Sequence, residues 1–143
     1  METNPPTVSK SPLRIVTLIA RILFGLVFLV FGLNGFLHFI PQPKDAMSEA
    51  AMAVVGGFMK SGYMFPLISG TQVIVGVLLL TNYFVPLALA LIAPEIVNIL
   101  AFHVFLEQKG LIIAIVVTAL EVYLAWAYRK AYYPMLALRV RPS

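Results

Sequence analysis

The hydrophobic positions of this chain fall into four long runs that are separated by short polar segments. We place the runs at about residues 13–40, 65–81, 85–106 and 111–128. A helix needs about 20 apolar residues to cross a bilayer, so each run predicts a membrane-spanning helix. A transmembrane β-barrel would need short alternating strands, and these unbroken runs exclude it. The pattern therefore predicts an all-α fold, an integral membrane four-helix bundle.

A shorter element lies between the first two runs, at about residues 45–60. Its apolar positions recur at helical spacing, at Met47, Ala50, Ala51, Val54, Val55 and Phe58. Asp45 is the expected N-cap, and Lys60–Gly62 ends the element. About 14 residues are too few to span a bilayer. We therefore predict a short amphipathic helix in the membrane interface.

The two ends of the chain differ from the runs between them. Residues 1–12 are polar and contain prolines, which is typical of a disordered N-terminal arm. Pro41 and Pro43 are expected to stop the first span. Residues 139–143 form a basic tail, so residues 13–138 make up one transmembrane domain.

Composition supports a membrane protein. Of the 143 residues, 61% are hydrophobic and 11% are charged, whereas soluble domains average about 45–50% and about 25%. The mean hydropathy is +0.95. The chain has no cysteine, which excludes disulfides, thiolate zinc sites and iron–sulfur clusters. No metal site is expected.

The positive charge follows membrane topology. The formal net charge is +4, and the excess of Lys and Arg lies near the termini, at Lys10, Arg14, Arg129, Lys130, Arg139 and Arg141. The positive-inside rule then places both termini in the cytoplasm, with the chain in the bacterial inner membrane. The partner of this charge is the lipid bilayer, and no nucleic acid is needed to explain it. Arg21 is expected to snorkel outward to the headgroups.

Polar residues inside the spans are costly, by roughly 2.5–3.5 kcal/mol for a central charge. Counting from the span ends places Glu95 and Glu121 near the midplane. Asn34, Gln72 and Asn98 follow, and His38 and His103 lie near the outer surface. We interpret this column as a site open to the outer face, to which every span contributes. Glu95, Glu121 and His103 would handle protons, and Asn34, His38, Gln72 and Asn98 would bind a ligand.

Two further interpretations apply to these residues. The glutamates are expected to be protonated, or to share hydrogen bonds with Gln72 and Asn98. Asn34 and Gln72 are equally compatible with simple hydrogen bonds between helices, and the histidines, near the interface, with simple hydration.

The first span also carries a stripe of glycines. Gly25, Gly32 and Gly35 recur at steps that keep them on one helix face, together with Arg21 and Phe28. Small residues at this spacing let two helix backbones approach closely. We therefore predict that Gly25, Gly32 and Gly35 pack against another helix.

Four stretches together resemble the DoxX family of small four-helix bacterial membrane proteins. They are "RILFGLVFLVFGLNGFLHF" (21–39), "SGYMFPLISGTQVIVGVLLL" (61–80), "FVPLALALIAPEIVNILAFHVFL" (84–106) and "ALEVYLAWAYRKAYYPML" (119–136). The resemblance implies the four-helix fold and a link to quinone or oxidative-stress chemistry. It also implies that Asn34, Glu95, Asn98 and His103 match polar positions of the family. Gln72 departs from it, since many relatives have a glutamate there.

Three functions are compatible with these features. The first is an accessory membrane subunit of a quinone-linked oxidoreductase, which takes electrons from a soluble or membrane redox partner protein and carries no covalent cofactor. The second is a non-catalytic scaffold that docks partner proteins through the glycine stripe and the interfacial helix. The third is proton-coupled transport of a small solute, which would require a homo-oligomer because the chain is too short for an inverted-repeat carrier. No self-contained catalytic motif is present in the sequence.

Overall fold

The chain folds into helices and short helical turns in the computed structural model, which describes residues 11–41, 45 and 47–142. Four helices are long and apolar enough to cross a membrane. They are α1 (Pro12–Leu37), α3 (Met64–Thr81), α4 (Val85–Phe105) and α5 (Leu111–Ala127), the last counted together with the 3₁₀ turn η1 (Gln108–Gly110) that leads into it. The all-helical prediction is confirmed, and the last three predicted spans agree with the observed helices within one residue at each end. Residues 1–10 of the predicted arm, including Lys10, lie outside the described residues, as do Pro43 and Lys44.

The first helix ends earlier than predicted, at Leu37 rather than at residue 40. His38 adopts the left-handed conformation, with φ of 52°, and its N–H donates to the Asn34 carbonyl at 2.8 Å. The Asn34 side-chain oxygen then accepts the Ile40 N–H at 2.7 Å. The prolines are not needed to stop the helix, because a left-handed residue and a side-chain acceptor already satisfy its end.

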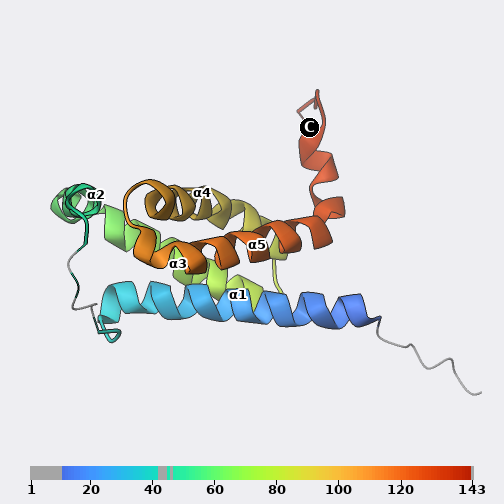
Figure 1. Cartoon of the computed structure of the whole chain (residues 1–143). Helices are drawn as coiled ribbons and strands as arrows, with labels where there is room; N and C mark the ends of the chain where they lie inside the picture. The colour runs from blue at the N-terminus through green and yellow to red at the C-terminus, as the bar shows by residue number, and fades with distance from the viewer. Residues whose placement is uncertain (1–10, 42–44, 46, 143) are drawn as a thin grey trace, which may run out of the picture.

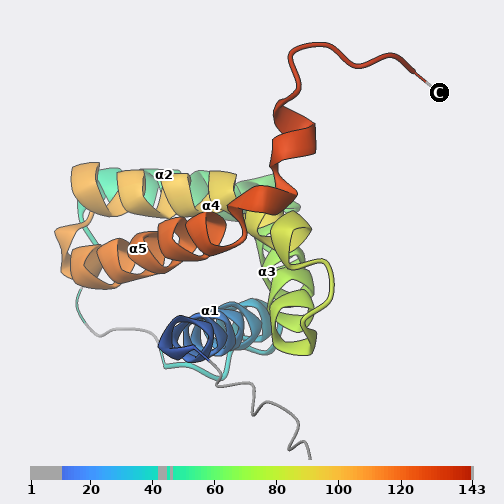
Figure 2. The same ribbon diagram turned by 90° about the vertical axis from the view of Figure 1, so that its right-hand side faces the viewer.

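The four long helices form a ring in which each contacts two neighbours. The α1 helix packs chiefly on α3, α3 on α4, α4 on α5, and α5 closes the ring against α1. Figures 1 and 2 show this arrangement from two sides. The side chains that fill the centre are almost entirely apolar, and the largest fully buried ones are Phe24, Val75, Leu79, Leu89, Ile92 and Leu124. Large apolar side chains also cover the outer faces, as expected of helices that lie in lipid.

The α1 and α3 helices approach each other through glycines. A Cβ atom on Gly32 would lie 2.9 Å from the Ser69 carbonyl oxygen, and one on Gly76 would lie 2.6 Å from the Leu29 backbone nitrogen. Gly25 and Gly35 also face α3 at close range. The glycine stripe is therefore filled by a helix of the same chain, which leaves no open surface there for another protein.

The short helix α2 (Glu49–Ser61) begins later than predicted. The prediction of Asp45 as N-cap is wrong, because Ser48 caps α2 by accepting the Ala51 N–H on its side-chain oxygen at 3.1 Å. Asp45 is exposed. The α2 helix lies crosswise to α1, at the end of the bundle where α1 ends and α3 begins (Figure 1). This placement is compatible with the predicted interfacial helix.

Arg21 does not extend outward, and that prediction is wrong. Its side chain is buried, with 7% of its surface exposed, and its guanidinium donates to the Leu79 carbonyl in the last turn of α3. The carbonyl end of a helix carries a partial negative charge, which favours a cation there. Arg21 thus lies between α1 and α3 instead of pointing away from them.

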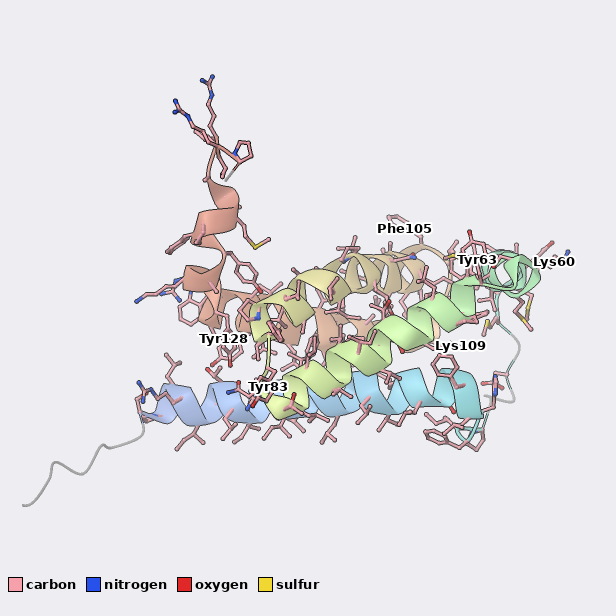
Figure 3. The ribbon with its side chains drawn as sticks, turned by 180° about the vertical axis from the view of Figure 1, so that it is seen from behind. Lys60, Tyr63, Tyr83, Phe105, Lys109 and Tyr128 are labelled. Carbon is pink, nitrogen blue, oxygen red and sulfur yellow. The ribbon has the colours of Figure 1, made fainter. Side chains whose placement is uncertain are left out.

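The chain after α5 turns away from the bundle in two short 3₁₀ turns, η2 (Arg129–Ala131) and η3 (Tyr133–Leu136). Figure 1 shows this segment leaving at the end of the bundle where α1 begins. Figure 3 places Tyr83 and Tyr128 at this same end, while Lys60 and Phe105 lie at the end that carries α2. The start of α1 and the end of α5 therefore share one end of the bundle, as an even number of long helices that alternate in direction requires.

Candidate functional site

A small cavity of about 180 Å³ lies where α2, α3 and α4 meet. Apolar side chains form most of its wall, and four polar side chains join them on α3 and α4. The lining residues are Val54, Val55, Phe58, Phe65, Ile68, Gln72, Glu95, Asn98, Ile99, Phe102 and His103. The cavity therefore brings together four of the seven polar residues that the sequence singled out.

Helical spacing explains why these residues share one cavity. Glu95, Asn98 and Phe102 follow one another at steps of three and four, which places them on one face of α4. Gln72 occupies the corresponding face of α3, two turns beyond Phe65. The two faces meet under α2, so a cavity forms where the short crosswise helix leaves space above them.

Glu95 and Gln72 form the polar centre of the cavity. The Gln72 side-chain amide donates a hydrogen bond to Oε1 of Glu95, and both side chains are half-buried. Among the residues that line the cavity, Glu95 is the only carboxyl group. In the described part of the chain only its Oε1 accepts a hydrogen bond, so Oε2 is available to a ligand. A carboxyl group held by an amide is able both to donate and to accept a proton.

His103 forms the end of the cavity next to the α4–α5 connection. Its Nδ1 lies 2.8 Å from the Glu107 carbonyl oxygen, which only accepts, so Nδ1 carries the proton and Nε2 keeps its lone pair in the neutral ring. The ring packs edge-on against Phe102, with centroids 5.4 Å apart. A Cβ atom on Gly110 would lie 2.6 Å from Nδ1, so glycine at this position allows the imidazole its place.

A clasp between Ser48 and Glu107 holds the start of α2 over the cavity. The Ser48 N–H donates to Oε2 of Glu107 at 2.9 Å, and the Ser48 hydroxyl donates to the Leu106 carbonyl at 2.5 Å. The hydrogen bond from the Ser48 N–H is the main reason that the pKa of Glu107 lies below its ordinary value. Sequence reasoning missed this pair, because the two residues are far apart in the chain and nothing local connects them.

Three predicted site residues lie elsewhere. Asn34 caps the end of α1, and His38 is exposed beyond it. Glu121 is buried in α5, with 8% of its surface exposed, and within the described residues its Oε2 has no hydrogen-bond partner. Its neighbour Tyr132 donates to the Pro86 carbonyl at 2.9 Å, and burial, followed by the charge of Glu121, raises the pKa of Tyr132. The predicted polar column, to which every span would contribute, is therefore wrong. The polar residues that do come together line a cavity between α2, α3 and α4.

The size of the cavity limits its occupant. Pockets for drug-sized ligands measure about 300–1,000 Å³, so 180 Å³ accommodates one ring or a small polar head, with any tail outside. In the described residues no three His, Cys, Asp or Glu side chains are grouped closely enough to hold a metal ion. No family model, curated protein or solved structure matches this chain.

Proposed function

We propose that this chain is a DoxX-like multi-pass protein of the bacterial inner membrane and that its α2–α3–α4 cavity binds the ring of a quinone or a similar small amphiphile. In this role it would be the membrane subunit of a redox or oxidative-stress system. The observation that carries the proposal is the Gln72–Glu95 hydrogen bond inside a cavity of ring size. Glu95 would exchange a proton with a ring oxygen of the ligand, and a partner protein would supply the electrons.

The surroundings of the pair support this assignment. Phe58, Phe65 and Phe102 provide flat apolar walls of the kind that ring-shaped ligands contact. Asn98 and His103 add a hydrogen-bonding amide and an imidazole on the same face of α4 as Glu95. The outward faces of the four long helices are apolar, so a lipid-soluble ligand would reach the site from the bilayer.

The scaffold alternative needs two docking surfaces, the glycine stripe and α2, and one of them is already covered. It required the glycine stripe of α1 to dock another protein, and α3 already covers that stripe. The second surface, on α2, remains, because Met52 and Met59 are exposed there. An interfacial helix would expose the same methionines to lipid, so they do not favour a protein partner.

The test is quinone binding by the purified full-length chain and by Glu95→Gln. Glu95→Gln keeps the shape of the side chain but removes its acidic proton. Hydrogen bonds to charged groups contribute about 1.5–3 kcal/mol, so we expect binding of a short-chain quinone in mild detergent to weaken by a factor of about ten or more. Glu49→Gln, an exposed change in the first turn of α2 outside the cavity, is the matched control. Unchanged affinity of Glu95→Gln, or no quinone binding by the unmodified chain, would contradict the proposal.

A further inference from the structure

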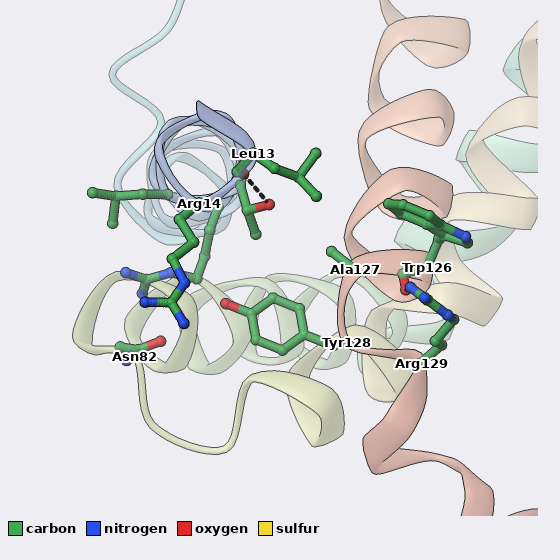
Figure 4. Close-up of a pocket in the computed structure, with 10 residues that line it drawn as sticks. Leu13, Arg14, Asn82, Trp126, Ala127, Tyr128 and Arg129 are labelled. Carbon is green, nitrogen blue, oxygen red and sulfur yellow. Dashed lines mark hydrogen bonds between the residues drawn. The ribbon is translucent and has the colours of Figure 1, made fainter. Parts of the chain in front are cut away.

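A second and larger cavity, of about 450 Å³, lies at the opposite end of the bundle from the Glu95 site. The first turns of α1, the α3–α4 turn and the end of α5 enclose it. Figure 4 shows Arg14 and Asn82 on one side of Tyr128, with Trp126 and Arg129 on the other. None of the seven polar site residues that the sequence singled out lines this cavity, so the cavity is a product of the fold.

Two arginines of α1 line the same wall of this cavity. Arg14 and Arg21 are seven residues apart, two helical turns, and therefore share one helix face. Arg21 is buried and is held through one N–H by the Leu79 carbonyl, which leaves four further donors on its guanidinium. Arg14 is exposed and lies two helical turns closer to the end of the bundle than Arg21.

The cavity contains positive charge without a matching negative charge. No carboxylate lines it, and within the described residues neither Arg14 nor Arg21 forms an ion pair. Two guanidinium groups that line one cavity repel each other in a partly buried site unless an anion balances their charge. Planar guanidinium groups bind phosphate oxygens in pairs, which makes phosphate the anion that fits best.

The opposite wall suits the rest of a lipid. Arg129 stacks on the ring of Trp126 at 4.5 Å and donates to its carbonyl at 2.9 Å. Trp126 also borders a neighbouring apolar cavity of about 570 Å³, which Leu100, Ile115 and Val122 of the α4 and α5 surfaces help to line. Trp126 therefore borders both cavities. The polar one suits the headgroup of a lipid, and the apolar one suits the acyl chain joined to it.

We propose that Arg14 and Arg21 bind the phosphate of an anionic phospholipid whose acyl chain lies along the apolar cavity beside Trp126. The arginine-rich end of the chain faces the cytoplasmic leaflet under the positive-inside rule, and that leaflet supplies anionic lipids. The site is separate from the Glu95 cavity, so it does not depend on quinone binding. A soluble phosphate compound shares the same anionic chemistry, and the experiment distinguishes it from a lipid.

The experiment uses Trp126, the single tryptophan of the chain, as the reporter. The full-length protein is placed in phosphatidylcholine vesicles that contain either brominated phosphatidylglycerol or brominated phosphatidylcholine, since bromine quenches tryptophan fluorescence on contact. We expect the anionic lipid to quench with a binding preference of roughly ten-fold, and Arg14→Gln to remove that preference. Arg14 is exposed, so this substitution leaves the folded core intact.

The matched control is Arg139→Gln, which removes the same charge from the exposed tail outside the cavity. It is expected to retain the preference. Equal quenching by the two lipids, or an equal loss in Arg14→Gln and Arg139→Gln, would overturn the proposal and leave only surface attraction. A preference that disappears when inorganic phosphate replaces chloride at constant ionic strength would assign the cavity to a soluble phosphate and overturn the lipid assignment.

Discussion

Single atoms decide how closely α1 and α3 pack. Gly76 on α3 lies against the backbone of Leu29 on α1, and backbone atoms cannot move aside as the tip of a flexible side chain can. Gly70, on the same helix, has open space where a Cβ would be added. Two glycines of one helix therefore have different roles, although the sequence alone does not separate them.

This difference makes a direct prediction. Gly76→Ala forces the two helices apart and is expected to lower the free energy of unfolding by about 1–3 kcal/mol. Gly70→Ala is expected to leave it unchanged or to raise it by up to about 1 kcal/mol, because alanine favours a helix over glycine. Denaturant titration of both variants in the same detergent provides the comparison. Equal stability of the two variants would contradict the close packing.

At the scale of an element, α2 is the part of the candidate site that is most easily released. Its contacts with the long helices are few, and its start is tied down by the clasp between Ser48 and Glu107. A carboxylate whose pKa lies below its ordinary value stabilises the folded state when it is ionised. The hydrogen bond between Ser48 and Glu107 therefore holds the start of α2 more firmly when Glu107 is charged.

The stabilisation by Glu107 is expected to depend on pH. Since its folded-state pKa is lowered from 4.5, the contribution is present above 4.5 and is lost as the pH falls through the folded-state value. Hydrogen exchange of the α2 amides, compared between the unmodified chain and Glu107→Gln, measures this effect. We expect faster exchange in Glu107→Gln at neutral pH and a difference that vanishes in acid. Glu49→Gln is the control, and a difference independent of pH would refute the role of the carboxylate.

At the scale of the whole molecule, the two ends of the bundle carry different chemistry. The end with α2 holds the Glu95 cavity, and the end where α1 begins and α5 ends holds the cavity that Arg14 and Arg21 line. An even number of apolar helices places the start of α1 and the tail after α5 on one side. The proposed orientation puts this arginine-rich side in the cytoplasm.

The orientation is testable with single cysteines, because the chain has none of its own. Lys60→Cys at the end of α2 and Arg139→Cys in the tail are both at exposed positions. A maleimide reagent that does not cross membranes is expected to label Lys60→Cys from outside intact cells, and Arg139→Cys only after the cells are opened. The reverse pattern would invert the topology, and labelling of both from outside would contradict a membrane-spanning bundle.

The sequence alone determined the helices and most of their limits. Long apolar runs without interruption leave the backbone one way to satisfy its hydrogen bonds in lipid, which is a helix, and the runs mark where each begins and ends. The high cost of a carboxyl group in an apolar segment also identified Glu95 as a candidate, and Gln72, Asn98 and His103 were named beside it.

Tertiary structure alone decided which polar residues meet. Asn34 has a local partner at the end of α1, so it does not join the cavity, and Glu121 lies on α5, a helix that contributes no residue to the cavity. Arg21 donates to a carbonyl of α3, and the sequence of α1 alone does not reveal this partner. Hydropathy depends on each residue's own transfer from water, whereas a cavity, a clasp or a buried cation depends on which faces of distant helices come into contact.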